Sequence, residues 1–170
     1  ILLFISLFSM DQTLRDEILQ ANITLHKDEA ALYDRIHPEL TNDDERDRLR
    51  RLLNLSVEKL PSGTPLRALD LGTGTGFVSQ ELLKRNFQVD AVDISAEMIE
   101  RLRTKQPEAL ARKQLKTVVQ DADRFLADEE GSYDLITASS VLHHFPDYSA
   151  TIKAMVSHLK PGGSLIFFHE

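Results

Sequence analysis

Positions 69–78 read Leu69-Asp70-Leu71-Gly72-Thr73-Gly74-Thr75-Gly76-Phe77-Val78. An apolar run begins at Leu66 before this segment, and an amphipathic pattern starts at its end. This order predicts a buried strand, a tight glycine loop and the first turn of a helix, which together open a βαβ unit. Glycine suits such a loop because turn conformations penalise a Cβ atom, and because a ligand can then lie directly against the backbone.

The spacing of the glycines is more informative than their number. A dinucleotide-binding fingerprint, G-x-G-x-x-G, would place its third glycine at position 77, which is Phe77. The sequence instead reads D-x-G-x-G-x-G. This pattern resembles motif I of the class I S-adenosylmethionine (SAM)-dependent methyltransferases, while a simple tight turn in another α/β protein is the alternative. The resemblance implies that the cofactor contacts Asp70, Gly72, Thr73, Gly74 and Gly76.

The composition is that of an ordinary globular chain. It has 170 residues, of which 42% are hydrophobic and 28% charged, so we expect one domain with a real core. The net charge of −7 argues against an electrostatic footprint for DNA or RNA. The absence of cysteine excludes disulfides and thiolate metal sites. We expect no nucleic-acid partner and a cytoplasmic location, although the absence of cysteine does not itself identify the compartment.

The first 65 positions precede the predicted α/β domain. Positions 1–9 are apolar and too few to span a bilayer, and we interpret them as a leader or the edge of a fragment ahead of Met10. Positions 10–60 are expected to form an N-terminal helical cap, because their leucines keep helical spacing. Proline and glycine at 61–65 indicate a linker. The domain itself is placed at 66–170.

A second predicted strand, positions 87–93, ends in Asp93. A carboxylate at such a strand end can accept hydrogen bonds from both hydroxyls of a ribose, which fits NAD and SAM equally. The alternative is that Asp93 only caps the next helix. Ile94 and Met98 follow as further candidate cofactor contacts, although Met98 could equally be a core residue. Ser95 is expected to cap the helix that contains Met98.

A third predicted strand, positions 115–120, leads into Asp121-Ala122-Asp123. The resemblance implies that the Asp121 carboxylate accepts from the exocyclic amine of adenine, and that the Ala122 N–H donates to its ring. Asp123 is a competing candidate, and either acid could instead cap a short helix. Tyr33 lies in a Tyr-Asp segment similar to one that closes over the methionine end of the cofactor in related enzymes. It could also be a half-buried helix aromatic.

After a fourth predicted strand, positions 133–138, the chain reads Ser139-Ser140-Val141-Leu142-His143-His144-Phe145. This region is close to motif IV of the ubiquinone-biosynthesis-like branch of the family, which implies that Ser139 contacts the cofactor. His143 or His144 could be a general base for a hydroxyl or an acidic carbon, or could simply pack around the strand end. No cysteine or third histidine lies at ligand spacing, so we expect no metal.

Leu159-Lys160-Pro161-Gly162-Gly163 is expected to turn into a fifth strand at 164–168. Together with motif I, this segment is typical of the class I methyltransferases, and the resemblance extends from Tyr33 to Phe168. It implies a doubly wound, parallel Rossmann-like sheet of order 3-2-1-4-5 that binds SAM at the carboxyl ends of its strands. The predicted function is methyl transfer to a small molecule. The alternatives are a non-catalytic SAM-binding fragment and an NAD-dependent oxidoreductase.

The family's sheet normally continues with an antiparallel pair after strand five, and the sequence contains no segments for it. We therefore expect the strand at 164–168 to form an open sheet edge that exposes Ile166, Phe167 and Phe168. No charge or proline blunts this edge. Self-association through it is the resulting prediction.

Overall fold

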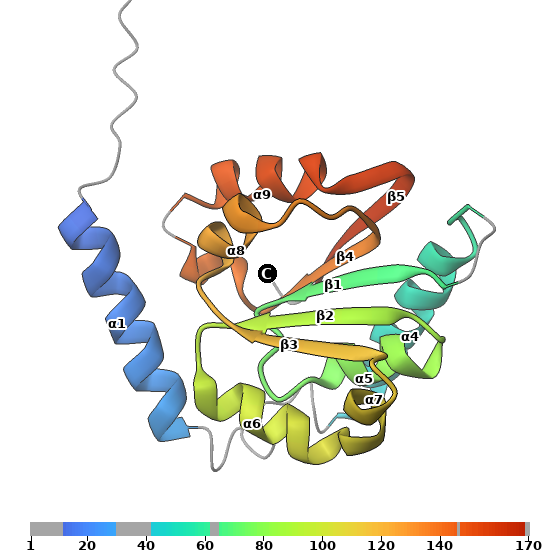
Figure 1. The fold of residues 1–170 in the computed structure, drawn as a ribbon, viewed down its shortest axis with the longest axis horizontal. Helices are drawn as coiled ribbons and strands as arrows, with labels where there is room; N and C mark the ends of the chain where they lie inside the picture. The colour runs from blue at the N-terminus through green and yellow to red at the C-terminus, as the bar shows by residue number, and fades with distance from the viewer. Residues whose placement is uncertain (1–11, 30–41, 62–64, 146, 169–170) are drawn as a thin grey trace, which may run out of the picture.

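The computed structural model describes residues 12–29, 42–61, 65–145 and 147–168. Within these ranges five strands form one parallel sheet in the order β3-β2-β1-β4-β5 (Figure 1). The predicted strand order is therefore confirmed. The strands are β1 (Arg67–Leu71), β2 (Gln88–Asp93), β3 (Leu115–Val119), β4 (Tyr133–Ser139) and β5 (Leu159–Phe168).

Helices cover both faces of the sheet (Figure 1). One face carries α4 (Asp43–Val57), α5 (Phe77–Lys84), α6 (Ala96–Lys105) and α7 (Pro107–Ala111). The other face carries α8 (Ala122–Asp128) and α9 (Tyr148–Ser157). A short 3₁₀ helix, η1 (Leu142–His144), follows β4, and α1 (Gln12–Glu29) stands at one side of the sheet.

Strand β1 shows why the central strands are apolar on both sides. Ala68 packs with α4 and α5, whereas Leu69 and Leu71 pack with α8 and α9. All three side chains are fully buried. A strand that is covered on both faces needs apolar residues at successive positions, which explains the continuous run seen in the sequence. Asp70 is the polar exception in this run.

Strand β5 differs from its prediction in two ways. It begins at Leu159 rather than at 164, and its register with β4 shifts, because Tyr133 pairs with Leu159 whereas Leu135 pairs with Ser164. The expected exposure of the apolar side chains is wrong for Phe168, whereas Ile166 and Phe167 are partly buried. Phe168 is buried, and Ile166 and Phe167 pack against the cores on opposite faces of the sheet. Helices cover both faces, and among the described residues the backbone edge of β5 that faces away from β4 has no strand partner.

Glu81 of α5 joins α4 to the sheet domain. Its buried carboxylate accepts hydrogen bonds from Lys84 (2.8 Å), Arg85 (2.9 Å) and, in α4, Arg50 (3.4 Å). Burial alone would raise the pKa of Glu81, but the hydrogen bonds and charges of these cations outweigh burial and hold the pKa at about 2. The ionised carboxylate therefore stabilises the fold.

Replacing Glu81 with glutamine is expected to lower the free energy of unfolding at neutral pH by about 2 kcal/mol, because three cations lose their shared partner. The pKa is lowered in the folded state, so this stabilisation is present above about pH 4.5 and is lost as the pH falls toward 2. Urea unfolding at several pH values measures the difference. Asp47→Asn is the control, since the Asp47–Arg50 pair is more exposed. Equal stability of Glu81→Gln and wild type at pH 7 would contradict the prediction.

Candidate functional site

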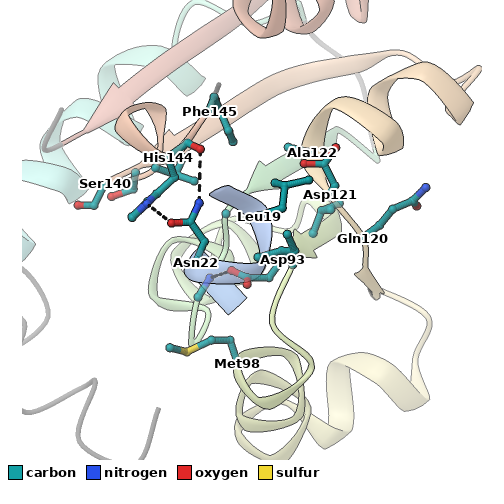
Figure 2. Close-up of a pocket in the computed structure, with 16 residues that line it drawn as sticks. Leu19, Asn22, Asp93, Met98, Gln120, Asp121, Ala122, Ser140, His144 and Phe145 are labelled. Carbon is teal, nitrogen blue, oxygen red and sulfur yellow. Dashed lines mark hydrogen bonds between the residues drawn. The ribbon is translucent and has the colours of Figure 1, made fainter. Parts of the chain in front are cut away.

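A pocket of about 640 Å³, counting its open part, lies at the carboxyl ends of β1, β2, β3 and β4 (Figure 2). Parallel strands end at the same edge of a sheet, which brings together side chains that are far apart in sequence. Eight of the predicted cofactor residues line it: Gly72, Gly74, Asp93, Ile94, Met98, Asp121, Ala122 and Ser139.

The other predicted cofactor residues lie elsewhere. Asp70, Thr73 and Gly76 do not line this pocket, and Tyr33 falls outside the described residues. Of the two histidines, His144 lines the pocket and His143 does not. The ring of His143 packs beside that of His144, with 4.1 Å between centroids.

Close packing explains two of the glycines. A Cβ on Gly72 would lie 2.3 Å from Cγ2 of Val141, and one on Gly76 would lie 2.2 Å from Cδ1 of Leu102. Both residues also have positive φ, +65° and +86°. The loop can therefore sit tightly between the segment after β4 and helix α6 only when these positions carry no side chain.

Asp70 holds the glycine loop from behind. Its Oδ2 accepts hydrogen bonds from the hydroxyls of Thr73 and Ser79, both at 2.7 Å, and its Oδ1 accepts from Thr137 at 2.8 Å. These donors belong to the loop, α5 and β4. Burial raises the pKa of Asp70 above its ordinary value, against the effect of the hydroxyl donors. This geometry gives Asp70 and Thr73 a structural task, and their contact with a cofactor stays a prediction.

Asp93 connects the glycine loop to the start of α6. Its Oδ2 accepts from the Gly74 N–H at 2.7 Å (Figure 2), and its Oδ1 accepts from the Ser95 N–H at 2.8 Å. The cap of α6 is Ser95, whose hydroxyl accepts from the Met98 N–H, so the alternative of Asp93 as the helix cap is wrong. A carboxylate oxygen has two lone pairs. Asp93 can therefore hold the loop and still accept hydrogen bonds from a ligand.

At the end of β3 the two acids have different partners. Asp121 caps α8 by accepting from the Arg124 N–H at 3.1 Å, and it also lines the pocket. Asp123 accepts from the hydroxyl of Thr151 in α9. Arg15 of α1 binds both acids, Asp121 at 3.0 Å and Asp123 at 2.8 Å. Asp121 therefore serves as cap, ion-pair partner and pocket wall together.

Helix α1 contributes pocket residues that sequence reasoning missed. Leu19 and Asn22 line the pocket, and Asn22 contacts His144 (Figure 2). No sequence signal places α1 there. The neighbours of predicted residues at the strand ends could have been found by position alone. The missed lining residues are Leu19, Asn22, Val92, Gln120, Ser140, Val141 and Phe145.

The described residues hold no cluster of three or more histidine, aspartate or glutamate side chains with the geometry to bind a metal ion. In the part of the chain that the structure describes, no helix combines the length and apolar character needed to cross a bilayer.

Residues 40–169 match the family described as methyltransferase domain. The chain belongs to this family. The match confirms the resemblance to the class I methyltransferases and disfavours the oxidoreductase alternative. The ubiquinone biosynthesis O-methyltransferase of Xanthomonas axonopodis pv. citri (strain 306) is 36% identical over 115 residues, which cover 68% of this chain and 46% of that protein. The chain thus spans less than half the length of the curated relatives it matches.

Solved structures show the same fold. N-methyltransferase NodS from Bradyrhizobium japonicum WM9, in complex with S-adenosylhomocysteine (SAH), is 25% identical with a TM-score of 0.69, covering 85% of this chain and 71% of that chain. Magnesium protoporphyrin IX methyltransferase from Synechocystis PCC 6803, with bound SAM, is 23% identical with a TM-score of 0.61, covering 94% and 76% of the two chains. The Rossmann-like methyltransferase fold is therefore confirmed. The predicted domain boundaries at 10–60 and 66–170 stay predictions.

Proposed function

We propose that the chain binds SAM in the pocket at the carboxyl ends of the strands and transfers its methyl group to a small molecule. The observation that carries the proposal is the Asp93 carboxylate, which lines the pocket and is fixed by the Gly74 N–H at 2.7 Å. An acceptor held against a glycine loop suits the two hydroxyls of a ribose. Support also comes from the SAM and SAH complexes of the structural neighbours.

The adenine end of the pocket offers a matching pair of groups. Asp121 supplies a carboxylate, and Ala122 is the first residue of α8, whose N–H has no acceptor within the helix. An acceptor followed by a donor fits the amine and the adjacent ring nitrogen of adenine. Among the described lining residues there is no lysine or arginine, which suits a cationic sulfonium better than the diphosphate of NAD.

When bound, SAM supplies a methyl group that is already activated by its sulfonium. The residues of this chain then have to align the acceptor and exclude water. Helix α1 contributes Leu19 and Asn22 to the pocket wall, and His144 lies on the wall formed after β4. We propose His144 as the base where the acceptor is a hydroxyl or an acidic carbon.

Calorimetric titration with SAH and, in parallel, with NADH tests the proposal. We expect SAH to bind with a single site per chain and NADH not to bind. If NADH binds and SAH does not, the result would favour the oxidoreductase alternative. The protein could bind SAH and still methylate none of a panel of small phenols, amines and carboxylic acids. That result would favour the alternative of a non-catalytic fragment.

Replacing Asp93 with alanine is expected to weaken SAH binding by about 2–3 kcal/mol, because hydrogen bonds from the ribose to a charged acceptor are lost. Asp93→Glu should be intermediate, since its longer arm misplaces the carboxylate. Calorimetry measures both affinities, and circular dichroism checks that each variant is folded. An unchanged affinity in Asp93→Ala would remove Asp93 from the site.

We further infer self-association through β5. Within the described residues β5 pairs with β4 on one side, and its other backbone edge is open to a second copy of the chain. Sedimentation velocity over a range of concentrations should show association that Leu165→Pro abolishes, since the Leu165 N–H faces away from β4 and proline there blocks pairing at the open edge. A stable monomer at all concentrations would contradict this inference.

The cytoplasmic location expected from the sequence stays a prediction.

A further inference from the structure

One face of α1 fastens this helix to the pocket. Arg15, Leu19 and Asn22 follow the i, i+4, i+7 spacing of a single helix face. Arg15 binds Asp121 and Asp123, Leu19 lines the pocket, and Asn22 reaches the loop after β4. The ion pairs two turns away therefore help to fix where the Asn22 side chain lies.

The Asn22 side-chain amide makes two contacts with His144. Its Oδ1 lies 3.1 Å from Nδ1 of the His144 ring, and its Nδ2 lies 3.5 Å from the His144 backbone carbonyl oxygen (Figure 2). The carbonyl can only accept a hydrogen bond, so the amide nitrogen faces it. The amide oxygen then faces the ring nitrogen, which must carry the proton for a hydrogen bond to form. This arrangement selects the neutral tautomer with hydrogen on Nδ1 and the lone pair on Nε2.

We propose that Asn22 is a positioning residue that sets the tautomer and the ring orientation of His144 for proton acceptance at Nε2. The proposal rests on the proposed methyl transfer in this pocket. As the new bond from the methyl carbon to the acceptor oxygen forms, the bond from that carbon to sulfur breaks and its electron pair stays on sulfur. The proton that the acceptor hydroxyl loses moves to Nε2 of His144. Asn22 Oδ1 then stabilises the imidazolium through Nδ1–H.

The same contact explains why a residue of α1 takes part in chemistry on a loop 122 positions away in sequence. Imidazole in water favours hydrogen on Nε2, which would leave the lone pair on the nitrogen facing α1. An acceptor fixed at Nδ1 reverses this preference. A helix that only covered the pocket would need no polar atom at this point, and an apolar residue like Leu19 would be sufficient.

Long-range ¹H–¹⁵N correlation spectra of the whole chain, labelled at histidine and recorded at mildly alkaline pH, test the proposal. The variant His144→Gln assigns the signals. Wild type should show the Nδ1–H pattern for His144, and Asn22→Ala should lower the ratio of Nδ1–H to Nε2–H roughly fivefold. Asn22→Asp should keep the Nδ1–H pattern, because it retains an oxygen acceptor. Gln20→Ala, at an exposed position of the same helix, is the matched control and should match wild type.

An unchanged tautomer ratio in Asn22→Ala, or an Nε2–H pattern in wild type, would overturn the assignment. The readout needs neither ligand nor turnover, so it is separate from the test of the proposed function. Titration of the same samples with SAH shows whether the cofactor proposal holds. Once a methyl acceptor is identified, Asn22→Ala should lower kcat about tenfold with little change in KM. Asn22→Asp should recover most of the loss. A loss confined to KM would assign Asn22 to binding instead.

Discussion

Replacing Gly74 with valine is expected to abolish SAH binding while the circular dichroism spectrum stays close to that of wild type. Gly74 lines the pocket and has a φ of +53°, a conformation that a β-branched residue adopts at a cost of about 1–2 kcal/mol. The valine side chain would also occupy space beside Asp93, whose carboxylate lies 2.7 Å from the Gly74 nitrogen. Backbone strain and steric exclusion thus act together. The expected loss of affinity is at least about a hundredfold.

The control for this variant is Gly162→Val. Gly162 also has positive φ, +81°, but it lies in β5 and does not line the pocket. It should lose stability through the same backbone strain and keep its affinity for SAH. Calorimetry and thermal unfolding of both variants separate the two effects. Normal binding by a folded Gly74→Val protein would mean that the glycine loop is only a turn.

The sheet order could be predicted because its determinants are local. Strands β1 and β2 are short, largely apolar runs that lead into a glycine and an acid, and the segments between successive strands are long enough for at least one helix. Parallel strands then bring their carboxyl ends together without further information. The position of Asp93 at a strand end predicts its place in the site, whereas Asp121 and Ser139 are expected there from the resemblance to the methyltransferases, and the structure places all three in one pocket.

Contacts with α1 could not be predicted in the same way. Arg15 meets Asp121 across 106 positions, and Asn22 meets His144 across 122. Amphipathic spacing indicates that α1 is a helix, but it carries no information about which surface the helix covers. The docking includes two ion pairs and the contact between Asn22 and His144, and none of these leaves a pattern in a single sequence. The exposure expected at Phe168 was wrong for a related reason, because burial depends on helices elsewhere in the chain.

The sequence also does not reveal which way the Asp70 side chain points. In a strand covered on both faces, apolar alternation does not reveal which side chain faces which layer. The Asp-x-Gly pattern suggested contact with a ligand, whereas the structure surrounds this carboxylate with Thr73, Ser79 and Thr137. The two possibilities predict different results on substitution, which makes Asp70 the most informative position to change.

Asp70→Ala is expected to lower the free energy of unfolding by about 3 kcal/mol, because three buried hydroxyls lose their shared acceptor and a cavity forms. Asp70→Asn should be close to wild type in stability or exceed it. Its amide oxygen can accept from Thr73 and Ser79, and its amide nitrogen can donate to Thr137, whose hydroxyl can donate to the Leu69 carbonyl at 3.3 Å. The asparagine thus keeps the hydrogen bonds and removes a buried charge.

The pH dependence of these variants distinguishes charge from hydrogen bonding at Asp70. Burial raises the pKa of Asp70 in the folded state, so the folded protein binds more protons than the unfolded chain above the ordinary value of 3.8. The contribution of Asp70 to stability therefore falls as the pH rises from about 4 through the raised pKa. The stability of Asp70→Asn relative to wild type should rise over the same interval in chemical unfolding experiments. SAH affinity of Asp70→Asn should match wild type, because Asp70 lies behind the pocket wall rather than in it. A large loss of affinity in a stable Asp70→Asn protein would instead support the cofactor contact that the sequence pattern suggests.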